Sequence, residues 1–153
     1  MDGVIAGIGG RRLTEGELRL IPASNADYSI HNGIGELKIF EEEPLEKKER
    51  QDEIAAYLSN NFSVPSEVDI NIKHLSEDAK RGYKEIVGKR IKKAVKKAAK
   101  QIKETKTALD RTLDFGIFLA VNNGYSSLPQ DEFDNLVLTH ARDATSQLIL
   151  YFA

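Results

Sequence analysis

The sequence contains no cysteine and only four prolines in 153 residues. Without cysteine the chain cannot form a disulfide framework, a thiolate zinc site or a cysteine nucleophile. Its three histidines, His31, His74 and His140, lie far apart in the sequence, which argues against a histidine metal cluster. No apolar run approaches the roughly 18–20 residues that span a bilayer, and glycines with Arg11-Arg12 interrupt the N-terminal stretch. We therefore expect a cytoplasmic protein with neither a signal peptide nor a membrane partner.

The composition is that of an ordinary globular protein, with 41% hydrophobic and 30% charged residues. A chain of this length can bury a substantial core as one domain. We expect a single domain over residues 1–153.

Charge is distributed unevenly along the chain, although the net charge is only −2. Residues 80–111 hold thirteen Lys or Arg and three acids, a local charge of +10, so the remainder carries −12. A basic block of this kind can face nucleic-acid phosphates, because neutralising them releases condensed counterions. It can equally be the solvated face of a helix.

Hydrophobic periodicity predicts the order of the elements. Alternation or continuous apolar runs predict strands, and apolar residues three or four apart predict helices. The expected strands are 17–21, 27–31, 34–40, 68–72, 115–121 and 148–152, and the expected helices are 44–59, 76–109 and 131–146, with the first dozen residues irregular. This order predicts an α/β fold with a mixed central β-sheet flanked by helices.

The segment 27–40 contains two alternating stretches around Asn32-Gly33, a dipeptide typical of two-residue hairpin turns. A turn at these residues would pair Ser29 with Glu36 and Asp27 with Lys38. Because side chains alternate along a strand, Asp27, Glu36 and Lys38 would then share one face. Two carboxylates and an ammonium would lie within reach of one small cation, or Asp27 and Lys38 would form a cross-strand ion pair.

The triplet Glu36-x-Lys38 carries little information as letters alone. With fourteen glutamates and fourteen lysines, chance predicts about one Glu-x-Lys, and the chain has three. Glu46-x-Lys48 and Glu104-x-Lys106 both fall on expected helices, where residues two apart do not share a face. Only Glu36-x-Lys38 lies on an expected strand with an aspartate on the preceding one.

This arrangement resembles the PD-(D/E)XK nuclease superfamily, whose fold is restriction-endonuclease-like. Its signature is an aspartate at the start of one strand and Glu/Asp-x-Lys on the next, matched here by Asp27, Glu36 and Lys38, with Ala26 replacing the usual proline. The helix 97–109 and the buried strand 115–121 also match. Residues 44–73 would be an insertion. Many members begin with a helix carrying a further acid, for which Glu15 or Glu17 is the candidate here.

The resemblance implies a metal-dependent nuclease that hydrolyses phosphodiester bonds, with DNA as the expected substrate. Asp27, Glu36 and the Leu37 carbonyl would hold Mg²⁺, for which Mn²⁺ would substitute, since hard cations take oxygen ligands. Lys38 would orient or deprotonate the attacking water and neutralise developing charge.

The long helix supplies the remaining candidates. Some branches of the superfamily place a Gln or Lys there, facing the site, and Gln101 is the candidate, although it could be an ordinary boundary residue of the helix. Lys93, Lys97 and Lys100 would bind the DNA backbone without specifying sequence. Duplex cleavage would favour a homodimer with two sites. The alternative function is a non-catalytic nucleic-acid-binding or assembly module that uses the lysine-rich helix 80–111.

Overall fold

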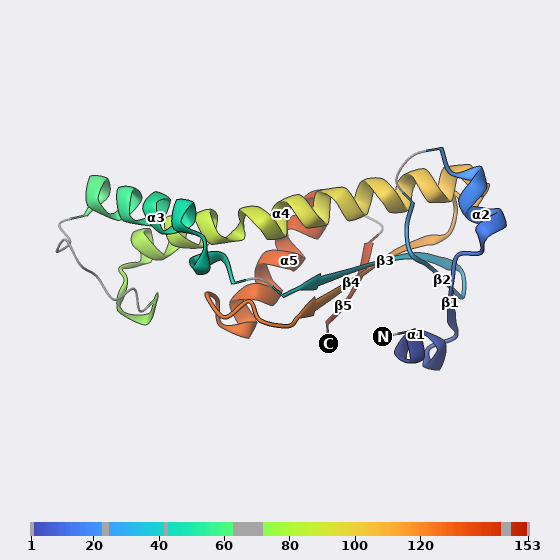
Figure 1. Ribbon diagram of the computed structural model, residues 1–153, viewed down its shortest axis with the longest axis horizontal. Helices are drawn as coiled ribbons and strands as arrows, with labels where there is room; N and C mark the ends of the chain where they lie inside the picture. The colour runs from blue at the N-terminus through green and yellow to red at the C-terminus, as the bar shows by residue number, and fades with distance from the viewer. Residues whose placement is uncertain (1, 23–24, 42, 63–71, 145–147, 153) are drawn as a thin grey trace.

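A computed structural model describes residues 2–22, 25–41, 43–62, 72–144 and 148–152 (Figure 1). Its elements, in chain order, are α1 (Asp2–Gly7), β1 (Gly10–Arg12), α2 (Glu15–Leu20), β2 (Tyr28–Ile30), β3 (Gly33–Phe40), the 3-10 turn η1 (Pro44–Glu46), α3 (Lys48–Asn61), the 3-10 turn η2 (Ile72–His74), α4 (Glu77–Ala108), β4 (Phe115–Asn122), α5 (Gln130–Ala144) and β5 (Leu148–Phe152). The protein is mixed α/β, as the sequence predicts. No helix in these ranges is long and apolar enough to cross a membrane.

The strands form one five-stranded mixed sheet whose spatial order follows the sequence, β1-β2-β3-β4-β5. The first three strands are antiparallel, and β3, β4 and β5 are mutually parallel. Parallel neighbours need a crossover connection, which is usually helical. Here α3 and α4 connect β3 to β4, and α5 connects β4 to β5.

The long helix α4 covers one face of the sheet, along β3 and β4 (Figure 1). Ser76 caps its N-terminus, because the Ser76 side chain accepts a hydrogen bond from the Ala79 N–H at 3.3 Å. Thirty-two residues then run without interruption to Ala108. Gly82 and Gly88 lower helix propensity but do not break the helix, because both are buried in its packed side.

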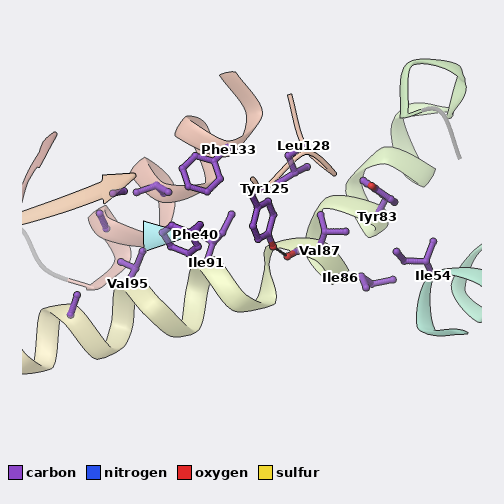
Figure 2. Packing of buried hydrophobic residues seen from close by; sticks show 14 of the residues in the cluster. Phe40, Ile54, Tyr83, Ile86, Val87, Ile91, Val95, Tyr125, Leu128 and Phe133 are labelled. Atoms are coloured by element: carbon purple, nitrogen blue, oxygen red, sulfur yellow. Dashed lines mark hydrogen bonds between the residues drawn. The ribbon is translucent and has the colours of Figure 1, made fainter. Parts of the chain in front are cut away.

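The main core lies between α4, α5 and the end of the sheet (Figure 2). Phe40, at the end of β3, meets Phe133 of α5 edge to face, with ring centroids 5.2 Å apart. Tyr125 packs edge to face on Phe40 and at a tilt against Phe133, and its buried hydroxyl donates to the carbonyl of Val87 on α4. A buried tyrosine normally needs such a partner. These contacts fix the register of α4 along the sheet.

A smaller core occupies the opposite face of the sheet. Ile5 of α1 packs there against Tyr28, Ile30 and Leu119, which come from β2 and β4. In Figure 1, α1 lies across the sheet from α4. Both faces of the antiparallel end are therefore covered by helices.

The N-terminal region differs from the sequence expectation. Residues 17–21 alternate and were expected to form a strand, but Glu15–Leu20 is helical. Thr14 and Glu17 form a capping box, in which each side chain accepts a hydrogen bond from the other residue's backbone N–H. Because the two side chains satisfy two backbone donors in this way, a helix begins here although apolar and polar residues alternate. The first dozen residues also form α1 and β1 instead of remaining irregular.

Most of the other helices and strands lie close to the ranges that hydrophobic periodicity predicts. The helices α3, α4 and α5 and the strands β4 and β5 occur within a few residues of their expected ranges. The expected strand at 68–72 falls almost entirely outside the described residues, and Ile72 begins a 3-10 turn.

The hairpin forms, but with a different turn. Ile30 pairs with Gly33, Ser29 with Ile34 and Tyr28 with Gly35, so the turn residues are His31 and Asn32. The predicted pairing of Ser29 with Glu36 and of Asp27 with Lys38 is wrong by two residues. Gly33 lies in the strand, paired with Ile30, and the lack of a side chain permits the close approach of Ile117, since a Cβ there would be 2.6 Å from the Ile117 side chain. A two-residue shift preserves the face of every side chain, so the predicted shared face is kept.

Arg111, three residues beyond the end of α4, stabilises the observed turn. Its guanidinium donates to the Ser29 hydroxyl at 2.7 Å and to the His31 carbonyl at 3.2 Å. His31 adopts a positive φ of 48°, which non-glycine residues seldom adopt. Contacts from a segment 80 residues away therefore select this turn.

Candidate functional site

The site lies where β2 and β3 separate. β3 is eight residues long and pairs with β4 over its whole length, but β2 pairs only with Gly33, Ile34 and Gly35. Asp27, directly before β2, extends the hydrogen bonding between the two strands with its backbone and its side chain. Its N–H donates to the Gly35 carbonyl at 3.0 Å, and its carboxylate accepts from the Leu37 N–H at 3.0 Å. The Asp27 side chain thus takes the place of a strand partner at the fork.

Glu36 lies at the centre of the site and is fully buried, with 0% of its surface exposed. Along β3 it lies between Ile34 and Phe40, which both pack in clusters that include α4 residues. Alternation therefore directs Glu36 to the side of the sheet that α4 covers. Lys38, two residues on and on the same face, donates to Glu36 Oε1. The second oxygen, Oε2, is buried with no hydrogen-bond partner among the described residues.

The electrostatics of Glu36 follow from this position. The pKa of the Glu36 carboxyl is raised from its ordinary value of 4.5 to about 7, mainly because burial deprives the charged form of its hydration. Of the neighbouring groups, Lys38 lowers this pKa and the Asp27 carboxylate raises it, and the value of about 7 includes both effects. Near neutral pH, Glu36 is poised between its protonated and ionised forms. Strongly shifted carboxyl groups of this kind occur preferentially at functional sites.

The observed register between β2 and β3 places Asp27 next to a different residue from the one the sequence predicts. Continued by one step beyond the Tyr28–Gly35 pair, it sets Asp27 opposite Glu36 instead of Lys38. The ion pair of Lys38 is accordingly with Glu36 on its own strand, and not the cross-strand pair with Asp27 that was the simplest structural alternative. The two carboxylates and the ammonium still converge, which is the arrangement expected from the shared face.

Helix α4 holds the chain segment that leads into Asp27. Gln101 Nε2 donates to the Asn25 carbonyl at 2.6 Å, and Thr105 Oγ1 accepts from the buried Ala26 N–H at 2.9 Å. Gln101 is only 7% exposed, and its Oε1 has no hydrogen-bond partner among the described residues. These contacts make Gln101 a positioning residue for the strand entry, and any contact of Gln101 with a substrate stays a prediction.

Thr105 and Asn25 belong to this site but were not expected from the sequence. The available signal was the spacing of Gln101 and Thr105, because two polar residues four apart lie on one face of a helix. Here that face borders an otherwise apolar stripe. Asn25 contributes only its backbone carbonyl, so no feature of its side chain could have identified it.

The three candidate DNA-binding lysines, Lys93, Lys97 and Lys100, are all exposed on α4. Their spacing of four and three residues places them along one solvent-facing side of the helix. Lys100 also pairs with Glu104 at 3.6 Å, at an exposed position where such pairs contribute little. The structure therefore leaves these ammonium groups accessible.

The donor set at the fork suits a hard cation. Asp27 and Glu36 offer carboxylate oxygens, and the buried Oε2 of Glu36 lacks a partner. Within the described ranges no group of three or more His, Cys, Asp or Glu side chains is close enough to hold a metal ion. Mg²⁺ commonly binds to one or two carboxylates and completes its octahedron with waters and substrate phosphates. By donor type the two carboxylates suit Mg²⁺ better than a metal that requires an all-protein cage, and of the two only Asp27 is partly open to solvent.

Comparison of the chain with protein-family models, with curated protein sequences and with solved structures found no match. What the Asp27–Glu36–Lys38 cluster does is therefore inferred from its own geometry and chemistry.

Proposed function

We propose that the protein is a metal-dependent nuclease that hydrolyses phosphodiester bonds in DNA and has a restriction-endonuclease-like fold. The observation that carries the proposal is the convergence of Asp27, Glu36 and Lys38 at the fork between β2 and β3, with a buried carboxylate oxygen left without a partner. The arrangement resembles that of the PD-(D/E)XK superfamily. The aspartate precedes one strand, Glu-x-Lys lies on the next, and a helix and a strand follow.

Asp27 and Glu36, with the Leu37 carbonyl, are the residues that hold the cation in this proposal. A bound Mg²⁺, or Mn²⁺ in its place, supplies positive charge to the phosphoryl oxygens and acidifies water. Asp27 is already positioned by the Leu37 N–H, so its carboxylate needs little reorganisation. Glu36 must be ionised to serve as a ligand, which its pKa of about 7 permits at neutral pH.

Lys38 acts on the reacting groups. Its side chain is 27% exposed, whereas its partner Glu36 is buried, so the ammonium lies at the boundary between the interior and solvent. From there Lys38 orients the attacking water and stabilises negative charge that develops on the phosphate. Its ion pair with Glu36 holds the long side chain in place before the substrate arrives. Gln101 supports the site indirectly by fixing Asn25, two residues before Asp27.

The lysine-rich α4 provides the contact with DNA in this proposal. Lys93, Lys97 and Lys100 bind backbone phosphates, which orients the substrate but does not select a sequence. Affinity should therefore fall steeply as salt is raised, because each phosphate contact releases counterions.

The decisive experiment measures cleavage of supercoiled and linear DNA by wild type and by Lys38→Ala, with Mg²⁺ or Mn²⁺. We expect the variant to lose at least about a hundredfold in rate, as is usual when a group acting on water or on developing charge is removed. Lys48→Ala is the matched control, because Glu46-x-Lys48 has the same letters but lies at the start of α3 with Lys48 exposed. Equal cleavage by wild type and Lys38→Ala would rule out this site.

The +10 charge of residues 80–111 favours a second candidate, a nucleic-acid-binding or assembly module without catalysis. It predicts that wild type binds DNA but leaves it intact with either metal. Loss of binding in a Lys93→Gln/Lys97→Gln variant, combined with no cleavage by wild type, would support this second function over the first.

A further inference from the structure

A cavity of about 680 Å³ lies along α4, away from the Asp27–Glu36–Lys38 cluster. Its lining includes Lys96, Lys103 and Lys106 of α4, and Gly116 near the start of β4. Lys103 follows Gln101 by two positions, which is about 200° around a helix. The cavity therefore opens on the flank of α4 opposite to the one that holds Asn25 through Gln101.

The walls of the cavity combine positive charge with apolar surface. Four lysines line it, namely Lys96, Lys100, Lys103 and Lys106, and no acidic side chain is among the described lining residues. Lys96 and Lys103 are exposed, so their ammonium groups can move to a ligand. The hydroxyl groups of Thr107 and Thr112 add hydrogen-bonding capacity at one end.

The apolar part of the lining comes from Ala99, Ile102 and Ala144. Ile102 is 3% exposed and also belongs to the core cluster beneath β3, so this wall is rigid. A volume of this size falls within the range of about 300–1,000 Å³ that is usual for small-molecule sites. A ligand that matches both parts carries phosphate at one end and a flat or apolar group at the other.

The surrounding charge favours an anion. Residues 80–111 carry +10 in a protein whose net charge is −2, and a concave surface with one sign of charge concentrates the field within it. We propose that this cavity binds a nucleotide-sized phosphate ester, either as a free nucleotide or as the phosphorylated end of a nucleic-acid strand. The exposed Lys96 and Lys103 bind the phosphates, and the base lies against the half-buried Ala99 and Ala144. This binding does not require the Asp27–Glu36–Lys38 cluster, although Lys100 belongs both to this lining and to the proposed DNA-binding lysines.

The test is isothermal titration of the full chain, without divalent metal, using ATP and a 5′-phosphorylated dinucleotide as the two probes. The pocket variant is Lys96→Gln/Lys103→Gln, and the matched control is Lys89→Gln/Lys92→Gln. The control removes the same charge from exposed positions of the same helix outside the lining. Glutamine preserves helix propensity in both variants.

We expect at least one probe to bind wild type and to lose about tenfold or more in affinity in the pocket variant, as expected when charge-assisted hydrogen bonds are removed. The control should lose less than threefold for ATP. Tighter binding of ATP indicates a free nucleotide as the ligand, and tighter binding of the dinucleotide indicates the phosphorylated end of a strand. No binding of either probe at millimolar concentration overturns the proposal, as does an equal loss of ATP affinity in both variants.

A third variant distinguishes binding inside the cavity from non-specific electrostatic binding to the lysines. Ala99→Leu leaves the charge unchanged and narrows the cavity at a half-buried helical position. Weaker binding by this variant supports the proposal, and unchanged affinity overturns it. Circular dichroism verifies that the variant is folded, and if it is not, the two lysine variants decide the question alone.

Discussion

The side-chain amide of Gln101 donates a hydrogen bond to the backbone carbonyl of Asn25, 76 residues earlier in the chain, at 2.6 Å. One helical turn later, Thr105 accepts a hydrogen bond from the next backbone N–H, that of Ala26. The two contacts attach the segment before β2 to α4. They place Asp27 at the fork, where its carboxylate reaches the Leu37 N–H. The geometry of the candidate site thus depends on a helix that contributes no acid to it.

Replacing Thr105 with valine tests this attachment. Thr105→Val keeps the shape of the side chain but leaves the buried N–H of Ala26 without an acceptor. We expect the free energy of unfolding to fall by about 1–3 kcal/mol, the usual cost of an unsatisfied buried donor. Urea denaturation measures this change. Thr107→Val is the control, because the Thr107 hydroxyl is exposed and bonds only within the helix. An equally small loss in both variants would contradict the structural role of Thr105.

Replacing Glu36 with glutamine should change how stability depends on pH. The folded-state pKa of Glu36, about 7, lies above the ordinary value of 4.5, so the folded protein holds this proton more tightly than the unfolded chain. The resulting stabilisation is complete below about pH 4.5 and is lost as the pH rises through 7. As the pH rises between those limits, the free energy of unfolding of wild type should fall by up to about 3 kcal/mol relative to that of Glu36→Gln.

Denaturant titrations of both proteins at about pH 5 and about pH 8 measure this difference. Because all other titratable groups are common to the two proteins, their contributions largely cancel. If the difference in free energy of unfolding between wild type and Glu36→Gln is the same at both pH values, the pKa of Glu36 is not raised by folding.

Metal binding at the fork should depend on pH for the same reason. A cation competes with the proton on Glu36, so Mn²⁺ affinity should rise by up to about tenfold per pH unit below 7 and level off above it. Isothermal titration with Mn²⁺ at several pH values measures this. Asp27→Asn should weaken binding at every pH. Binding that is equally tight in wild type and in the Asp27→Asn and Glu36→Gln variants would place the metal elsewhere.

Gly124, in the loop after β4, should not tolerate a side chain. It has a φ of +129°, and a Cβ there would lie 2.8 Å from the Glu41 backbone oxygen. We expect Gly124→Ala to destabilise the protein by about 1–3 kcal/mol, because both the conformation and the contact are unfavourable. Gly16→Ala is the matched control in the exposed helix α2, where nothing lies closer than 4.0 Å. It should be neutral or stabilising by up to about 1 kcal/mol, and thermal unfolding distinguishes the two.

Much of the fold could be predicted because local signals and tertiary packing agree. The apolar spacing of α4 and the capping residue Ser76 correspond to the observed helix. The apolar run from Phe115 corresponds to β4. At residues 17–21 two local signals conflict, since alternation predicts a strand whereas Thr14 and Glu17 cap a helix. The cap prevails there, because it satisfies two backbone donors, which the alternation of a five-residue segment does not do.

That Asp27, Glu36 and Lys38 share a face follows from the local sequence, since side chains alternate with a period of two and any even shift of register preserves the face. Which of the three side chains meet depends on contacts between distant parts of the chain. Arg111 binds the turn at Ser29 and His31, and the register that this turn gives sets Asp27 opposite Glu36. The covering helix α4 and the rest of the core bury Glu36 and raise its pKa. These effects arise from α4 and Arg111, which lie more than forty positions along the chain from the residues they act on, and no local pattern encodes that proximity.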